Sequence, residues 1–193
     1  MKLKKTKNLI MFIGKTHSGK TTFAKELEEI NHDVLVLEAD PIALFMRENF
    51  PKLREMDDKE HSVKFKNVSL KYKIFLLLLE FSMSFDKTII LSNSNMYSSG
   101  RKLIFNLAKK FNYKIIGVYF DFPEELLVSR IKKSKRTTKI LRVSKDFNEL
   151  IINQRTRMQI PNPKDFNKFF IVNSESNFNE MKKDLIKIIK NSN

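Results

Sequence analysis

The chain has 193 residues, no cysteine and a formal net charge of +15. This length is typical of one domain with its own hydrophobic core, and the lack of cysteine excludes disulfides, thiolate metal sites and a cysteine nucleophile. The charge favours a nucleic-acid partner, but the abundance of lysine, asparagine, isoleucine and phenylalanine seen in chains from AT-rich genomes would also produce it. We expect a single domain over residues 1–193.

The apolar runs at residues 9–13 and 74–79 are short. The first follows a basic N-terminus, as in a signal peptide, but it is too short and no small-residue cleavage site follows it. The second is far below the roughly 20 residues that a membrane span needs. The expectation is a cytoplasmic protein without a membrane partner.

Apolar runs alternate with helical patterns along the chain, without internal repeats or Pro/Gly/Ser-rich linkers. Near-continuous apolar strands joined by helical crossovers are typical of a parallel sheet covered by helices. The helix at residues 98–111 is expected to bury Leu103, Leu107 and Phe111. The pattern predicts strands at 9–13, 33–38, 87–91, 114–120 and 169–172, helices at 20–30, 41–49, 65–85, 98–111, 124–133, 147–158 and 178–190, and an exposed connection at 52–66.

The stretch GKTHSGKT at residues 14–21 matches the phosphate-loop pattern G-x-x-x-x-G-K-[ST] at every fixed position. It lies between an apolar strand and a helical pattern, the context in which backbone N–H groups and a helix N-terminus bind phosphate. A chance match is disfavoured because the chain has only four glycines. Lys20 is expected to reach the β- and γ-phosphates, and the Thr21 hydroxyl to bind Mg²⁺.

The motif predicts ATP and Mg²⁺ as cofactors. It also specifies the fold as α/β, a three-layer α/β/α P-loop NTPase with a five-stranded parallel sheet. The His17 side chain, at a variable position of the motif, is interpreted as incidental. The residues expected to bind the nucleotide are Gly14, Thr16, His17, Ser18, Gly19, Lys20, Thr21 and Thr22.

Polar residues follow the second and third predicted strands, where ligands of such sheets bind. Asp40 could accept a proton from an attacking hydroxyl or hold a magnesium-bound water, or it could cap the helix that begins at Pro41. Ser92, Asn93 and Asn95 lie where P-loop enzymes often have a metal-side aspartate. An amide can orient a phosphate or a substrate but cannot neutralise a metal. This run could also be only a turn.

Residues 130–145 contain eight lysines and arginines and no acidic residue. Cations carried by a closing segment would stabilise a transferring phosphoryl group and exclude water. We expect a basic helical lid at about 130–158, with Arg155 and Arg157 available to line the same cleft. A solvated basic face is the alternative interpretation.

With these motifs, the chain resembles the P-loop kinases of the polynucleotide 5′-hydroxyl kinase and zeta-toxin-like group. These are AAA-type ATP-binding enzymes that also include small-molecule kinases. The likeness covers most of residues 8–158. Four blocks carry it: GKTHSGKTTFAKEL, LEAD, KTIILSNSNMYSSGRKLIFNLAKKFNYKIIGVYFDFPEELLVSR and KKSKRTTKILRVSKDFNELIINQRTRM.

The resemblance implies roles for individual residues. Asp40 matches the general base on the acceptor hydroxyl, and Arg130 and Arg136 match lid arginines that contact the donor phosphates. Asn93 departs from the group's usual aspartate, and Arg47 lies further from Asp40 than the group's spacing. The catalytic residues so implied are Lys20, Asp40, Arg130 and Arg136, and the substrate-binding residues are Arg47, Asn93, Asn95 and Arg101.

The leading hypothesis is an ATP- and Mg²⁺-dependent phosphotransferase acting on a hydroxyl group. The resemblance and the basic charge favour the 5′-hydroxyl of DNA or RNA as the acceptor. A nucleoside, a sugar or a nucleotide-sugar is the alternative acceptor. A nucleic-acid-binding ATPase switch is a different class of function, and a degenerate relative that binds nucleotide for structural reasons is a third possibility.

Overall fold

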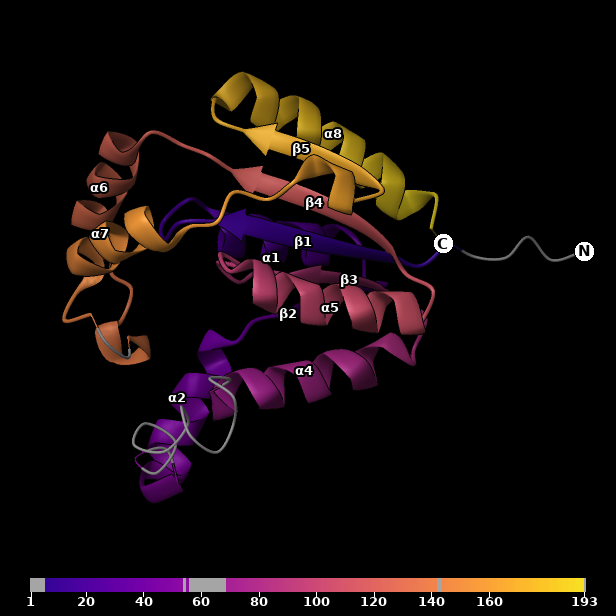
Figure 1. Cartoon of the computed structure of the whole chain (residues 1–193). Coiled ribbons are helices and arrows are strands. Elements are labelled where there is room, and N and C mark those ends of the chain that lie inside the picture. Colours follow the sequence, from indigo (N-terminus) through magenta and orange to yellow (C-terminus); the bar gives the residue numbers. More distant parts are fainter. Residues whose placement is uncertain (1–5, 54, 56–68, 142–143, 193) are drawn as a thin grey trace, which may run out of the picture.

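The computed structural model describes residues 6–53, 55, 69–141 and 144–192 (Figure 1). Most of the connection predicted at 52–66, the first residues of the helix predicted at 65–85, and Arg142 of the basic run lie outside the described residues. Five parallel strands form one sheet in the order β2-β3-β1-β4-β5. They are β1 (Asn8–Gly14), β2 (Val34–Leu37), β3 (Thr88–Leu91), β4 (Lys114–Phe120) and β5 (Lys168–Val172).

Helices connect successive strands, and the two faces of the sheet are covered by different helices (Figure 1). The helices are α1 (Lys20–Ile30), α2 (Asp40–Asn49), α4 (Leu70–Met83), α5 (Ser98–Lys110), α6 (Glu124–Lys133), α7 (Phe147–Arg157) and α8 (Glu175–Lys190), with short 3₁₀ turns η1 (Thr138–Ile140) and η2 (Pro163–Asp165). The predicted parallel α/β P-loop fold is confirmed.

Strand β1 is buried along its whole length at the centre of the sheet. Its side chains alternate between the two faces, as expected for a strand. Leu9, Met11 and Ile13 belong to the core under α4 and α5, whereas Ile10 and Phe12 belong to the core under α1 and α8. Burial on both faces explains why the strand is a continuous apolar run in the sequence.

Two local predictions were wrong. The N-cap of α2 is Ala39, and Asp40 is already its first helical residue, so the Asp40 carboxylate is not a helix cap. Helix α5 buries Arg101, Ile104 and Ala108. Of the predicted face, Leu107 and Phe111 pack against the core, but Leu103 is 39% exposed. The hydrophobic pattern missed this face because a buried arginine is one of its members.

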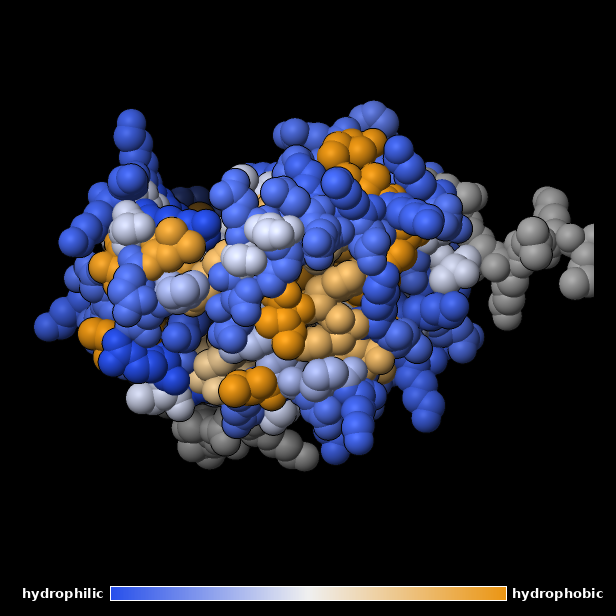
Figure 2. Space-filling view, turned by 90° about the horizontal axis from the view of Figure 1, so that it is seen from above, coloured by the Kyte–Doolittle hydropathy of each residue, from blue (hydrophilic) through white to orange (hydrophobic). Residues whose placement is uncertain are grey.

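Figure 2 shows the molecule from the side of α8 and β5, where hydrophobic residues gather in patches between long hydrophilic side chains. β5 is an edge strand of the sheet, and its Ile171 is 51% exposed. Within the described residues, no helix is both long and apolar enough to span a membrane.

Gly117 of β4 is expected to tolerate no side chain. An added Cβ atom would lie 2.6 Å from Phe169 Cδ2 and 2.8 Å from Phe166 Cδ1, and these two rings pack on each other with centroids 5.0 Å apart. Gly117→Ala should therefore lower the free energy of unfolding by about 1–3 kcal/mol, the usual cost of overpacking. Urea unfolding measures this, and Asn106→Ala, at an exposed position of α5, should change it by less than about 0.5 kcal/mol. Equal stability of Gly117→Ala and the wild type would contradict the prediction.

Candidate active site

The loop between β1 and α1 depends on its two glycines. Gly14 has φ +151°, and a Cβ atom there would lie 2.8 Å from the Phe120 carbonyl oxygen of the neighbouring strand. Its N–H donates to the Ser94 carbonyl at 3.0 Å, which ties the loop to the end of β3. Gly19, with φ +91°, is the N-cap of α1. The loop thus leaves β1 in a backbone conformation that side chains disfavour.

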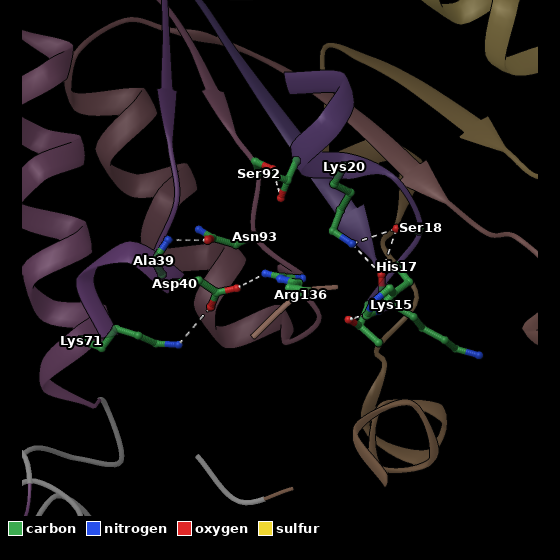
Figure 3. A network of polar contacts seen from close by, with 12 residues as sticks. Lys15, His17, Ser18, Lys20, Ala39, Asp40, Lys71, Ser92, Asn93 and Arg136 are labelled. Carbon is green, nitrogen blue, oxygen red and sulfur yellow. Dashed lines mark hydrogen bonds and ion pairs between the residues drawn. The ribbon is translucent and has the colours of Figure 1, made fainter. Parts of the chain in front are cut away.

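Lys20 is buried and folds back over the loop (Figure 3). Its Nζ atom donates to the Lys15 carbonyl at 2.6 Å and to the Ser18 hydroxyl at 2.8 Å. Ser18 in turn donates to the same carbonyl at 2.9 Å. Both hydrogen-bond partners of the ammonium group are therefore neutral oxygens.

Burial lowers the pKa of Lys20 to about 7, because a charged ammonium group loses hydration inside the protein. The nearby Arg136 guanidinium contributes to this lowering, while the carboxylates of Asp40 and Glu38 oppose it. An anion bound at the loop would favour the charged form of Lys20. The loop is thus a site that gains electrostatic stability when a phosphate occupies it.

Asp40 lies at the start of α2, at the carboxyl end of β2, and faces the basic segment (Figure 3). Its Oδ2 atom accepts a hydrogen bond from Arg136 at 2.6 Å, and its Oδ1 atom is 3.8 Å from Lys71 Nζ. Arg136 also lies over the Phe147 ring, with its guanidinium carbon 5.7 Å from the ring centroid. A carboxylate and an arginine of the basic segment therefore meet at this edge of the sheet.

Arg130, at the end of α6, approaches the phosphate loop from the other side. It donates to the His17 carbonyl at 3.3 Å and lies over the Phe122 ring, 5.0 Å from its centroid. On α7, the Gln154 Oε1 atom accepts a hydrogen bond from the Thr16 N–H at 2.7 Å. Helices α6 and α7, at the two ends of residues 130–157, thus both contact the loop.

His17 packs against this segment as well. Its ring lies edge-on to Phe147 at a centroid distance of 4.7 Å, and its Nδ1 atom is 3.0 Å from the Thr16 hydroxyl. Burial lowers the pKa of His17, and the charges of Arg136 and Lys20 lower it further. The imidazole is thus an uncharged packing group between loop and α7, rather than the incidental side chain that we expected.

A cavity of about 1680 Å³ lies over the loop. Its walls come from the phosphate loop, the start of α2, the β3–α5 connection, the basic segment and residues 173–175 at the start of α8. Within the described part of the chain, Gly14 and Arg47 are the predicted site residues that do not line it. Those that do are Thr16, His17, Ser18, Gly19, Lys20, Thr21, Thr22, Asp40, Asn93, Asn95, Arg101, Arg130 and Arg136.

Three of the predicted substrate-binding residues bind backbone groups at the wall of the cavity. The Asn93 Oδ1 atom accepts from the Ala39 N–H at 2.8 Å, and Asn95 donates to the Phe12 carbonyl at 2.7 Å. Arg101, which is buried, donates to the Asn95 carbonyl at 2.9 Å. These side chains position the β3–α5 connection, and they border the cavity at the same time.

The other arginines divide between cavity and surroundings. Arg47 donates to the Leu141 carbonyl and so joins α2 to the residue after η1. Arg155 is paired with Glu124 and does not line the cavity. Arg157, two residues further along α7, lines it. The expectation that both α7 arginines line the cleft was therefore wrong for Arg155.

Sequence reasoning missed several residues of the site. Gln154, Lys71, Phe122 and Phe147 carry no motif, and only the fold brings them to the loop or to Asp40. A polar residue within an amphipathic helix, as Gln154 is, gives no local sign that it will be buried.

Residues 9–156 match the family AAA_33, described as an AAA domain. The chain belongs to this family. It is 27% identical to the L-seryl-tRNA(Sec) kinase of Methanococcus maripaludis over 96% of this chain and 67% of that protein. The AAA domain of this chain is a P-loop domain of the kinase type, and the predicted enzyme class, an ATP-dependent kinase, is confirmed.

Solved structures share the fold of this AAA domain. A putative kinase from Chloroflexus aurantiacus has a TM-score of 0.64 at 18% identity, over 96% of this chain and 95% of that one. Kti12 of Chaetomium thermophilum, in complex with ADP-AlF3, has a TM-score of 0.61 at 16% identity, over 94% and 98% of the two chains.

Nucleotide binding at pH 8 is expected to take up about one proton. Lys20, with a pKa of about 7 in the free protein, is mostly neutral at this pH, and a neighbouring triphosphate would raise its pKa and protonate it. Titration calorimetry with a non-hydrolysable ATP analogue in buffers of different ionisation enthalpy measures the uptake. His17→Asn should keep it and Lys20→Met should lose it. Equal uptake by wild type and Lys20→Met would refute the assignment.

Proposed function

We propose that this chain transfers the γ-phosphate of ATP to a hydroxyl group, with Mg²⁺ as the metal and Asp40 as the general base. The observation that carries the proposal is the Arg136–Asp40 hydrogen bond of 2.6 Å inside the cavity that the phosphate loop lines. A carboxylate, a guanidinium and the phosphate loop border one space, and this arrangement supports phosphoryl transfer.

On the donor side, the loop N–H groups and Lys20 would hold the phosphates. The Thr21 hydroxyl would bind Mg²⁺, which neutralises charge on the β- and γ-phosphates when bound. Arg130 and Arg136, on the basic segment, would contact the transferring group. We take residues 130–158 as a lid because this segment contacts the loop through Arg130 and Gln154.

On the acceptor side, Asp40 would accept the proton of the attacking hydroxyl. The hydroxyl oxygen then forms a bond to the γ-phosphorus, while the bond between that phosphorus and the β–γ bridging oxygen breaks and ADP leaves. Asp40 is 38% exposed and lies on the cavity wall, so a hydroxyl group can reach it without rearrangement of the core.

We favour a hydroxyl carried by a polynucleotide, with the 5′-hydroxyl of DNA or RNA as the first candidate. The net charge of +15 and the cavity-lining cations Lys71, Arg101 and Arg157 support an anionic acceptor. The 27% identity with an L-seryl-tRNA(Sec) kinase favours a second candidate, the serine hydroxyl of an aminoacylated tRNA. A nucleoside or a sugar is the small-molecule alternative.

Asp40→Asn tests the general base. The amide cannot take the proton, so kcat is expected to fall by about 10²- to 10⁴-fold. The variant should still bind a non-hydrolysable ATP analogue, because the partners of Asp40 among the described residues are Arg136 and Lys71 and not loop residues. Asp121→Asn is the matched control, since Asp121 also follows a strand but lies outside the cavity wall. Undiminished transfer by Asp40→Asn would refute this role.

Radiolabel transfer from ATP to a panel of acceptors tests the acceptor. We expect labelling of a 5′-hydroxyl oligonucleotide, with a KM that rises steeply with salt. Labelling of seryl-tRNA alone would establish the second candidate, and salt-independent labelling of a nucleoside would establish a small-molecule kinase. If no acceptor is labelled but DNA affinity depends on ATP, the chain is an ATPase switch.

Two arginines of α7 give a matched pair for the polynucleotide acceptor. Arg157 lines the cavity, and Arg155 is paired with Glu124 outside its wall. Arg157→Gln should raise the KM for the oligonucleotide and lower its logarithmic salt dependence by about one, whereas Arg155→Gln should change neither. Identical behaviour of the two variants would place the acceptor elsewhere.

A further inference from the structure

The proposed metal site lacks an evident carboxylate. Mg²⁺ in phosphotransfer sites is bound by one or two carboxylates in addition to phosphates and water, yet the residues directly after β3 are Ser92 and Asn93. Asp40 is engaged by Arg136 and Lys71. Among the described residues, no group of three or more His, Cys, Asp or Glu side chains is arranged to hold a metal ion.

Asn93 does not supply the missing ligand. Its Oδ1 atom accepts the Ala39 N–H, and its Nδ2 atom is buried without a hydrogen-bond partner in the described part of the chain. An amide NH₂ group is a donor and cannot bind a cation. The end of Asn93 that remains available is therefore the wrong one for Mg²⁺.

Glu38 lies beside this position on the adjacent strand. β2 and β3 pair in parallel with Leu37 opposite Leu91, and the Ser92 N–H donates to the Leu37 carbonyl at 3.1 Å. Glu38 and Ser92 are thus the next residues of the same ladder. Because side chains alternate along a strand, Glu38 shares the face of Val36, which packs with the core under α1.

The register neighbour of Glu38 contacts the predicted metal ligand. The Ser92 hydroxyl donates to Thr21 Oγ1 at 3.3 Å (Figure 3). The Glu38 carboxylate is close enough to Lys20 for its charge to raise the pKa of that group. Glu38 therefore follows β2 beside Ser92, whose hydroxyl reaches the first turn of α1.

One oxygen of Glu38 lacks a partner. Its Oε1 atom is buried and accepts no hydrogen bond from the residues that the structure describes. A buried carboxylate oxygen without a donor is costly, and such atoms in native structures have a ligand or a function. A cation with its bound water would satisfy this oxygen, and carboxylate oxygen is the donor that Mg²⁺ prefers.

We infer that Glu38 is the magnesium-side carboxylate of this enzyme, acting with the Thr21 hydroxyl on the metal ion that accompanies ATP. The inference rests on the proposed function, because it assumes a metal–nucleotide complex at the loop. It places the carboxylate that binds the metal at the end of β2, one strand away from the neutral Ser92–Asn93 pair.

The test separates metal binding from catalysis. The affinity of the full chain for a non-hydrolysable ATP analogue is measured by calorimetry with Mg²⁺ and with EDTA, and Mn²⁺ binding to the nucleotide complex is measured by electron paramagnetic resonance. Glu38→Gln should lose at least about tenfold in metal affinity and most of the Mg²⁺-dependent gain in nucleotide affinity. Any effect of Glu38→Gln through Lys20 should appear equally in Mg²⁺ and in EDTA, so the difference between the two affinities isolates the metal ligand.

Glu28→Gln is the matched control. Glu28 is an exposed glutamate of α1 that accepts from the backbone of β2 at Val36, and its replacement should leave the metal dependence unchanged. Adding Asn93→Asp to Glu38→Gln should restore it, because aspartate keeps the acceptor for the Ala39 N–H and removes the unpartnered NH₂ group. Thermal unfolding establishes that each variant is folded.

The outcomes are distinct. Undiminished Mg²⁺ dependence in Glu38→Gln overturns the inference, even if phosphoryl transfer is lost. Lost Mg²⁺ dependence with restoration by Asn93→Asp supports it, even if no acceptor is labelled. A wild-type chain whose nucleotide affinity does not depend on Mg²⁺ overturns both the inference and the proposed use of the metal.

Discussion

The site is organised by one buried cation, the ammonium group of Lys20. Its hydrogen-bond partners are a backbone carbonyl and a hydroxyl, so its charge is compensated only from a distance. Burial brings its pKa down to about 7, because the protein replaces little of the hydration that the ammonium group loses. A phosphate bound at the loop would stabilise the charged form of Lys20, and this stabilisation would add to the affinity for the phosphate.

The sheet order decides which groups surround this cation. β1 lies between β3 and β4, so the loop that leaves it is bordered by the carboxyl ends of both neighbours. Gly14 allows β4 to pass at Phe120, and its N–H binds Ser94 beyond β3. Because β2 is next to β3, the acidic residues Glu38 and Asp40 reach the same edge. Parallel strands thus bring groups from distant parts of the sequence to one end of the sheet.

The sequence predicted the fold well for identifiable physical reasons. Strands buried on both faces are continuous apolar runs, and helices that follow them begin at recognisable positions, so α1 and α6 were predicted with their observed ends. The wrong prediction for Leu103 of α5 has an equally physical cause. Arg101 is buried because backbone carbonyls satisfy its guanidinium, and hydrophobic periodicity has no means of ranking such a residue above Leu103.

Predictions of the site succeeded where a motif is local and failed where a contact is distant. The loop residues follow from eight consecutive positions. The hydrogen bond between Gln154 and the Thr16 N–H joins residues 138 positions apart. The sequence around either residue does not predict this bond. The same holds for Lys71 beside Asp40 and for the unpartnered oxygen of Glu38, since burial and partner are properties of the assembled sheet edge.

Arg136 connects the two halves of the proposed reaction. In the free protein it donates to Asp40 and at the same time disfavours the charge of Lys20. A triphosphate on the loop carries more negative charge than a single carboxylate and would compete for this guanidinium. With Arg136 on the phosphates, Asp40 would keep its ion pair with Lys71, at 3.8 Å, and its Oδ2 atom would be open to a hydroxyl proton. The base would therefore be released by the arrival of the donor, so that one arginine orders nucleotide binding before activation of the acceptor.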